Sequence, residues 1–382
     1  MASVMSFPTR IVYGKGAIQR LPDELKRVGA TRPLLVTDKG ILKAGLLRFV
    51  TPLLEQAGIK AQVFSEFEAN PTDADAIRGG EAYRGAKADS VLGVGGGASL
   101  DMAKAVALLA HHQPPLAQYD DAKGGDAKIT AEVPPIVQVP TTAGTGSEVG
   151  RSTVLVIDGT KTVIFSPYLM AKVAILDPEL TVGLPPFVTA ATGMDALTHN
   201  LEAYVARGEH PLADAIAIDG LRRIAGHLKR AVQNGRDLEA REQMLLGSAF
   251  GAIAFQKGLG ACHSLAHALT PVAGTHHGLA NSLMLPAVIN FNRMAAEERL
   301  ATAAVALGAD PKMSVQERAH LCVELVDDLR GECGLPRRLS QAGVTREMFP
   351  RIVEKALADA CHQSNPRPVT QVDFERLIQE AF

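Results

Sequence analysis

The sequence predicts two domains, an α/β domain built on a parallel sheet and an all-helical domain after it. Over residues 33–176, short β-branched runs alternate with longer helical patterns, which is typical of β-α-β units. From Pro186 onward, β-type runs become scarce and Ala/Leu-rich segments with helical periodicity dominate. The length of 382 residues fits two domains at roughly 100–200 residues each. We place the boundary near Leu184, which gives domains of residues 1–184 and 185–382.

In the first half, strands and helices are expected in alternation. PLLVTD is predicted as a buried strand, and LLRFVTPLLEQAG as a helix that ends at Gly58. AQVFSEF and SVLGVGGG are the next strands, followed by helices over TDADAIRGGEAYRGA, with Thr72 as N-cap, and SLDMAKAVALLAHH. PPIVQVP, STVLVI and VAILDP are three more predicted strands.

In the second half, the periodicity predicts helices. TAATGMDALTHNLEAYVA and DLEAREQMLLGSAFGAIAFQ show it over long segments. Near the C-terminus, Thr370 and Asp373 have the spacing of a capping box and predict a last helix.

Composition excludes several classes of function. Lys plus Arg number 39 against 41 Asp plus Glu, so nothing draws the chain electrostatically to nucleic acid or anionic lipid, and we expect small-molecule partners. No run of about 18 uncharged apolar residues occurs, and MASVMSFPTR lacks the pattern of a secretion signal. The four cysteines lie far apart, which favours a reducing compartment. We therefore expect a cytoplasmic protein.

A glycine-rich loop lies between a predicted strand and helix. Gly93, Gly95, Gly96 and Gly97 would let backbone amides approach a pyrophosphate at the N-terminus of the helix. A tight turn without ligand is the alternative, and three consecutive glycines weigh against it because they cost backbone entropy. The usual dinucleotide fingerprint requires an acid that ends a strand roughly 20 residues later, and the chain has only loop acids there.

Two other segments could complete a dinucleotide site. Asp38 ends the strand LLVTD and could accept hydrogen bonds from an adenosine ribose, where its charge would repel a 2′-phosphate, so NAD is favoured over NADP. Equally, Asp38 could simply start a turn. The loop VPTTAGTGSEV supplies hydroxyls that could hold ribose or phosphate, or form a plain turn, from Thr141, Thr142, Thr145 and Ser147.

Histidines in the second half indicate a metal site. Asp195 and His199 are four residues apart on a predicted helix, so both project from one face. Four more candidates follow within fifteen residues: His263, His267, His276 and His277. One carboxylate with three imidazoles suits Fe(II) or Zn(II) far better than Mg(II). A lone Asp-x-x-x-His pair would more simply be a surface helix, but imidazoles on apolar segments need partners. Spacing alone leaves open which histidines ligate.

Taken together, the motifs resemble the iron-containing (group III) alcohol dehydrogenase family. They are FPTRIVYGKGAIQRL, GVGGGASLDMAK, PTTAGTGSEV, AILDPELTVGLP, TAATGMDALTHNLEAY, GLGACHSLAHAL, HHGLANSLMLP and NPRPVT. The resemblance implies a dinucleotide-binding α/β domain and a helical metal-binding domain, on a plan shared with dehydroquinate synthases, with the metal in the intervening cleft. It assigns the metal, Fe(II) with Zn(II) as the alternative, to Asp195, His199, His263 and His277, and it places His267 beside the site.

The same resemblance assigns the NAD contacts to Asp38, Gly96, Gly97, Thr141, Thr142 and Thr145. We add Gly95, from the glycine loop, and Ser99, because Ala98 stands where many relatives have a serine that contacts phosphate and Ser99 follows immediately.

The expected reaction is reversible oxidation of a small primary alcohol to its aldehyde, or of an alcohol to a ketone, by hydride transfer to NAD. His267 is the candidate proton relay, and a role in orienting a metal ligand is the alternative. Two rival activities remain. One is a hydroxyacid-oxoacid transhydrogenase, with Arg151 facing the carboxylate, and the other is a dehydroquinate synthase-like lyase. Relatives are commonly dimers or larger, so a homo-oligomer is expected.

Overall fold

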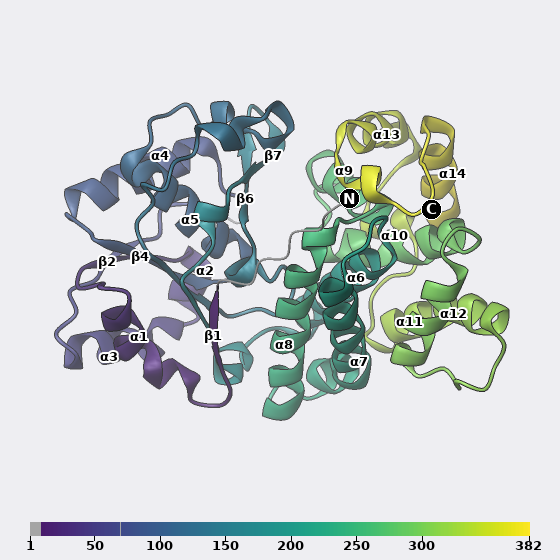
Figure 1. Cartoon of the computed structure of the whole chain (residues 1–382), viewed down its shortest axis with the longest axis horizontal. Helices are drawn as coiled ribbons and strands as arrows, with labels where there is room; N and C mark the ends of the chain where they lie inside the picture. The colour runs from purple at the N-terminus through teal and green to yellow at the C-terminus, as the bar shows by residue number, and fades with distance from the viewer. Residues whose placement is uncertain (1–8, 69) are drawn as a thin grey trace. The chain divides into compact units, whose positions relative to one another are not determined.

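The computed structural model describes residues 9–68 and 70–382. The expectation that the N-terminus carries no targeting segment falls mainly on residues 1–8 and lies outside the described residues. The described residues form two compact units, an α/β unit of residues 9–142 and 146–183 and a helical unit of residues 143–145 and 184–382 (Figure 1). None of the helices within these ranges is long and apolar enough to cross a bilayer.

A parallel sheet is the centre of the α/β unit, as predicted. Among the described residues it has six strands in the order β1-β8-β5-β4-β2-β3, and every neighbouring pair is parallel. The strands are β1 (Arg10–Tyr13), β2 (Pro33–Val36), β3 (Gln62–Phe64), β4 (Ser90–Gly95), β5 (Ile136–Pro140) and β8 (Val173–Leu176). Because parallel strands end at one edge, the segments after β2, β4 and β5 share that edge.

Helices cover both faces of this sheet. Successive residues of β2 enter different cores, Leu34 one and Leu35 the other, because side chains alternate along a strand. The first core also contains residues of α4 (Asp73–Gly85) and α5 (Gly97–His111), and the second residues of α1 (Leu21–Arg27) and α3 (Thr51–Gln56). The short α2 (Lys39–Lys43) follows β2 directly.

Two predicted elements of this unit differ in the structure. STVLVI forms β6 (Ser152–Ile157), which leaves the parallel sheet and pairs antiparallel with β7 (Thr160–Phe165). The cause is the tight turn between them, where Asp158 and Gly159 both have positive φ, the geometry of a two-residue hairpin. The helix predicted from Leu46 is a 3₁₀ turn followed by α3, because Pro52 in the first turn of α3 cannot continue a helix through that point.

The helical unit contains nine α-helices among its described residues, and no strand is found in it. They are α6 (Pro186–Val205), α7 (Pro211–Gln233), α8 (Leu238–Ala254), α9 (Ala261–Ala273), α10 (His277–Asn292), α11 (Glu297–Leu307), α12 (Val315–Glu332), α13 (Phe349–Ala358) and α14 (Gln371–Ala381). The central α6 packs against α7, α8 and α10. The predicted N-cap of α4, Thr72, and the predicted capping box of α14, at Thr370, are both formed.

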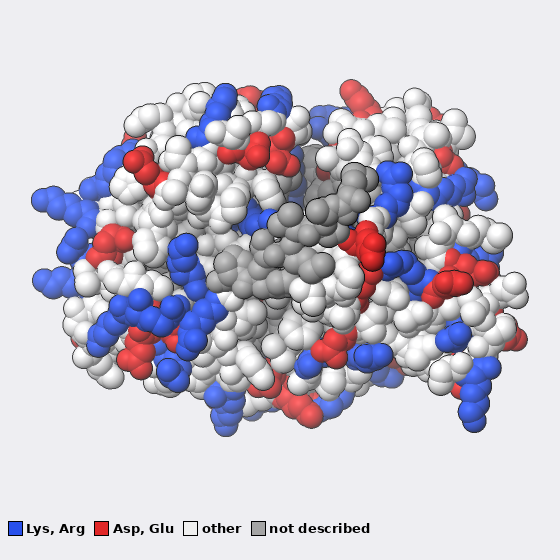
Figure 2. All heavy atoms as spheres, in the orientation of Figure 1, with Lys and Arg blue, Asp and Glu red and all other residues white. Residues whose placement is uncertain are grey.

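Charges of both signs are mixed on the surface. On the face drawn in Figure 2, Lys and Arg side chains stand beside Asp and Glu side chains over both units. The two signs are thus interspersed on this face, and the formal net charge of the whole chain is -2.

Candidate active site

The glycine-rich loop joins β4 to α5 in the way the sequence predicts. Gly96 is the N-cap of α5 and leaves the first turn of the helix without a side-chain cap. Gly95 has φ +150°, and a Cβ there would lie 2.5 Å from the Ser99 hydroxyl oxygen. A Cβ at Gly96 would lie 3.3 Å from the Thr142 methyl carbon. The loop therefore presents bare backbone at a helix N-terminus, which is the arrangement that binds phosphate.

Asp38 lies beside this loop. Its carboxylate caps α2 by accepting a hydrogen bond from the Ile41 amide (3.0 Å), so a short helix begins where a turn was the alternative. The same carboxylate accepts a second hydrogen bond from the Ser99 hydroxyl (2.6 Å). The structure therefore brings Asp38 together with the glycine loop.

The second predicted loop is divided between the two units. Thr141, the first residue after β5, is adjacent to the glycine loop, because its amide donates to the Gly95 carbonyl (2.9 Å). The Thr141 hydroxyl is buried and has no hydrogen-bond partner among the described residues. Thr142 also belongs to the α/β unit, whereas Thr145 groups with the helical unit.

A buried ionic cluster joins α5 to the second loop, and sequence reasoning missed it. The fully buried Lys104 ammonium donates to the Ser147 hydroxyl oxygen (3.0 Å) and to the Ser152 carbonyl (2.8 Å). The Ser147 hydroxyl in turn donates to the Asp101 carboxylate (2.6 Å). Burial lowers the pKa of Lys104 to about 8, and it raises the pKa of Asp101 above its ordinary value and that of Glu148 to about 7.

Removing the Lys104 ammonium should make the protein less stable to unfolding. We expect Lys104→Met to lower the free energy of unfolding by about 3–5 kcal/mol, because the buried Asp101 loses the cation that acts on it most strongly. Urea denaturation monitored by circular dichroism measures the loss. Lys39→Met is the matched control, since the exposed Lys39 forms an ion pair with the exposed Glu68 and its loss should leave unfolding unchanged. Equal stability of Lys104→Met and the parent would contradict the role of the cluster.

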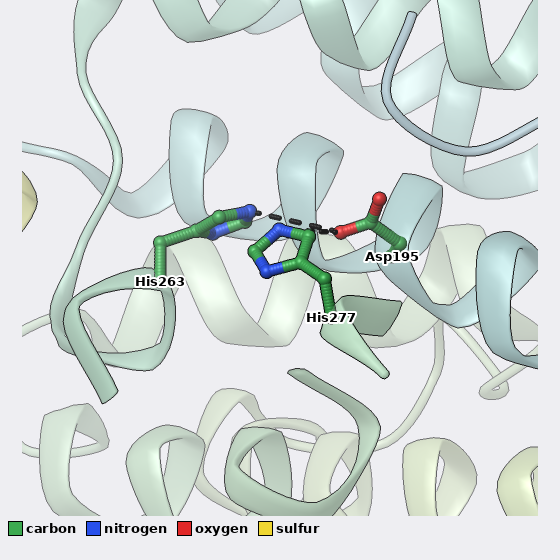
Figure 3. A group of neighbouring side chains, drawn as sticks. All are labelled: Asp195, His263 and His277. Carbon is green, nitrogen blue, oxygen red and sulfur yellow. Dashed lines mark ion pairs between the residues drawn. The ribbon is translucent and has the colours of Figure 1, made fainter. Parts of the chain in front are cut away.

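In the helical unit, three helices bring together three of the predicted metal ligands. Asp195 projects from α6, His263 from the first turn of α9, and His277 is the first residue of α10; Figure 3 shows their side chains pointing toward one another. The Asp195 Oδ1 atom lies 3.4 Å from His277 Nε2 and 3.8 Å from His263 Nε2. Ligand atoms around a tetrahedral ion with bonds of about 2.1 Å lie about 3.4 Å apart, so these distances fit a metal ion.

The surroundings of the three ligands also fit a cation. The Asn281 amide nitrogen lies 2.7 Å from Asp195 Oδ1 and 3.3 Å from Nε2 of both His263 and His277. An amide has two hydrogens and so cannot donate to all three atoms at once. Close approach of the helices makes the cluster feasible, since a Cβ at Gly278 would lie 2.2 Å from the Ala191 carbonyl oxygen of α6.

His199, the fourth predicted ligand, lies next to this group. Its ring stacks on the His263 ring with centroids 4.5 Å apart, and its nitrogens are not among the three ligand atoms that lie within 4.8 Å of one another. Its Nδ1 atom is buried without a hydrogen-bond partner. Burial lowers the pKa of His199 to about 4, so the imidazole is neutral at pH 7, as ligation requires.

The two remaining histidine candidates have different positions. The His267 ring stacks on the His277 ring at 5.2 Å, and its Nδ1 atom is hydrogen-bonded to the Asp359 carboxylate (2.8 Å). That carboxylate also accepts from the Ser264 hydroxyl and the Cys361 amide, both at 2.8 Å. His276 is exposed and packs edge-on against Phe187.

Glu202 supports the site and was not predicted. Its carboxylate accepts hydrogen bonds from His263 Nδ1 (2.6 Å) and from the Cys262 amide (2.8 Å). It thereby fixes the ring of His263 and replaces the missing side-chain cap of α9, whose N-cap is Gly260. A Cβ at Gly260 would lie 2.6 Å from Glu202 Oε1. A signal was available, because positions 195, 199 and 202 share one helical face.

The hydrogen bond from His263 should matter for metal affinity. We expect Glu202→Gln to weaken metal binding by about 10–100-fold. The new side-chain amide would place an N–H group opposite the His263 Nδ1–H or the Cys262 amide, and the His263 ring would lose its fixed orientation. Competition with a chelating dye measures the affinity directly, independent of turnover. Glu239→Gln, which alters an exposed ion pair on α8, is the control and should bind metal as the parent does. Unchanged affinity in Glu202→Gln would show that the ring needs no such support.

The comparisons with known proteins cover almost the whole chain. Residues 8–178 match a family model described as iron-containing alcohol dehydrogenase, and residues 189–382 match the C-terminal model of the same family. A 4-hydroxybutyrate dehydrogenase from Cupriavidus necator is 41% identical, with 98% of each chain covered. An NAD-dependent methanol dehydrogenase from Bacillus methanolicus is 35% identical, again with 98% of each covered. A crystal structure of 1,3-propanediol oxidoreductase superposes with a TM-score of 0.95 at 36% identity, covering 100% of both chains.

Proposed function

This chain belongs to the iron-containing alcohol dehydrogenase family, and from that premise we propose that it binds NAD and a divalent metal and oxidises a small primary alcohol reversibly to its aldehyde. The chain is an oxidoreductase that acts on alcohols. The single observation that carries the metal-dependent part is the convergence of Asp195, His263 and His277 on one point among three helices. We propose His199 as the fourth ligand, Fe(II) as the ion, and Zn(II) as the alternative.

In the proposed reaction, the alcohol carbon transfers a hydride to NAD and the alcohol oxygen loses a proton. A bound divalent metal supplies Lewis-acid stabilisation of the substrate oxygen. Glu202 holds the His263 ring in the orientation that the structure records, and Asp359 does the same for His267. We propose that His267 accepts the proton. Its ring stacks on the ring of one proposed ligand, and its Nδ1 is already bonded to a carboxylate.

We propose that the α/β domain, residues 1–184, holds NAD, and that residues 185–382 form the metal-binding domain. The pyrophosphate would lie on the bare amides of Gly95, Gly96 and Gly97, and the adenosine ribose on Asp38. Thr141, Thr142 and Thr145 would contribute hydroxyls, and the buried, unpartnered Thr141 hydroxyl supports this. We also propose a cytoplasmic homo-oligomer.

Turnover with a panel of alcohols tests the function. Holoenzyme with NAD is offered 4-hydroxybutyrate, 1,3-propanediol, methanol and longer primary alcohols, and NADH and aldehyde are both measured. We expect net NADH to accumulate in equal amount to aldehyde with at least one of them, and metal analysis to find one ion per chain. Hydride exchange between a hydroxy acid and an oxo acid without net NADH would instead establish a transhydrogenase.

A further inference from the structure

The Asp38 carboxylate has few acceptor positions left for a ligand. An ionised carboxylate offers about four lone-pair positions on its two oxygens. One on Oδ1 is used by the Ile41 amide, at 3.0 Å, and one on Oδ2 by the Ser99 hydroxyl, at 2.6 Å. Each oxygen thus retains one acceptor position, and a ribose offers two neighbouring hydroxyl donors. The two protein hydrogen bonds fix where these acceptor positions point.

The bond from Ser99 ties the carboxylate to the glycine loop. Ser99 is fully buried in the first turn of α5, 61 residues from Asp38 in the chain. Gly95 leaves the space for this contact, because a Cβ there would lie 2.5 Å from the Ser99 oxygen and 3.4 Å from Asp38 Oδ2. The Ser99 hydroxyl has one hydrogen, which is donated to Asp38, so it cannot be donated to a phosphate at the same time. In this structure the Ser99 hydroxyl therefore serves Asp38.

The Asp38 carboxylate stands apart from the ion pairs of its neighbours. Within the described ranges, no Lys, Arg or His forms an ion pair with Asp38. The adjacent Lys39 ammonium is directed to Glu68 instead, at 2.6 Å. A coenzyme with a 2′-phosphate would meet an unneutralised carboxylate that cannot rotate away without losing a charge-assisted hydrogen bond.

We propose that Ser99 is a positioning residue for coenzyme choice: it holds the Asp38 carboxylate where its free acceptor positions bind the adenosine ribose diol and its charge excludes a 2′-phosphate. This inference rests on the proposed function, in which Asp38 binds the ribose of NAD. It assigns to Ser99 an effect on the ratio of NAD to NADP use, and no direct effect on pyrophosphate binding.

Ser99→Ala tests the proposal on the metal-loaded enzyme. The ratio of kcat/KM with NAD to kcat/KM with NADP should fall about tenfold, the loss expected for one charge-assisted hydrogen bond. Binding of NADH and NADPH, followed by their own fluorescence, gives the same ratio without turnover. Ser99→Cys, with a similar shape and a weaker donor, should give an intermediate ratio.

Two further variants separate the explanations. Ser90→Ala is the matched control, because it also removes a serine hydroxyl that donates to an aspartate, in this case Asp89. Ser90 lies at the start of β4, the strand that leads into the glycine loop, and the NAD to NADP ratio of this variant should equal that of the parent. In an Asp38→Gly background, Ser99→Ala should change the ratio no further. A ratio that still shifts in that background would overturn the proposal, because Ser99 would then act without Asp38.

Three other outcomes would also overturn it. If Ser99→Ala weakens NAD, NADP and ADP equally and the ratio stays constant, the hydroxyl serves the phosphates. If Asp38→Gly itself leaves the ratio unchanged, the proposed role of Asp38 in NAD binding fails, and the proposal about Ser99 fails with it. A changed ratio in Asp38→Gly with a parental ratio in Ser99→Ala refutes the role of Ser99 alone.

Discussion

Asp195→Ala should leave the protein folded but without bound metal and without turnover. Asp195 supplies the one carboxylate oxygen of the convergent group, and its loss leaves two imidazoles and the Asn281 amide facing one another. If four ligands together contribute about 10–16 kcal/mol, one of them is worth on the order of 3 kcal/mol, more than a hundredfold in affinity. Metal content after gel filtration and NADH formation are measured on the same sample.

The control for Asp195→Ala is an aspartate with no part in the site. Asp219 on α7 pairs with Arg223 at the surface, and Asp219→Ala should retain both metal and activity. A variant at Asp195 that holds a full complement of metal would show that the convergent group is not the binding site. A variant that loses its metal but keeps parental turnover would refute the metal-dependent mechanism.

His267→Ala should have the opposite signature, with metal retained and turnover reduced by about 10²–10⁴-fold, the usual contribution of a positioned acid or base. His267 stacks on His277 but is hydrogen-bonded through Nδ1 to Asp359, so its removal leaves the convergent group intact. Metal content and kcat are compared with those of the parent. Loss of metal would make His267 a ligand.

Chemical rescue distinguishes a proton relay from a residue that only orients its neighbours. Added imidazole should restore part of the activity of His267→Ala, because a free imidazole can accept a proton in the vacated space. It should restore none in Asp195→Ala, where the defect is the missing metal. Failure of imidazole to rescue a metal-replete His267→Ala would leave His267 the alternative role of orienting His277.

Much of the fold was predictable because it depends on local patterns. β-branched runs predicted β2, β4, β5 and β8, and the N-cap at Thr72 and the capping box at Thr370 marked two helix starts correctly. Prediction was less successful where the structure depends on which strands pair with each other. β6 has the composition of a sheet strand, yet a two-residue turn pairs it with β7 instead of the parallel sheet. Side-chain periodicity says which face is buried and not which neighbour covers it.

The site shows the same limit. Asp195, His263 and His277 were candidates by residue type, and the structure brings them together. Lys104 lies in an otherwise apolar helix, and only the fold shows its hydrogen bonds to Ser147 and Ser152. Asp359 reaches His267 across 92 residues of chain, which no spacing rule detects.

Glu202 couples the stability of the first turn of α9 to the metal affinity of the site. The same carboxylate closes the open end of α9 and steers the imidazole that is proposed to bind the ion. If the metal ion binds more tightly when the first turn of α9 is ordered, metal binding stabilises that turn by the same free energy. The coupling is reciprocal, so ordering the turn also tightens metal binding. Loading the site should therefore slow hydrogen exchange at the first amides of α9, and any change that frays this helix end should release metal.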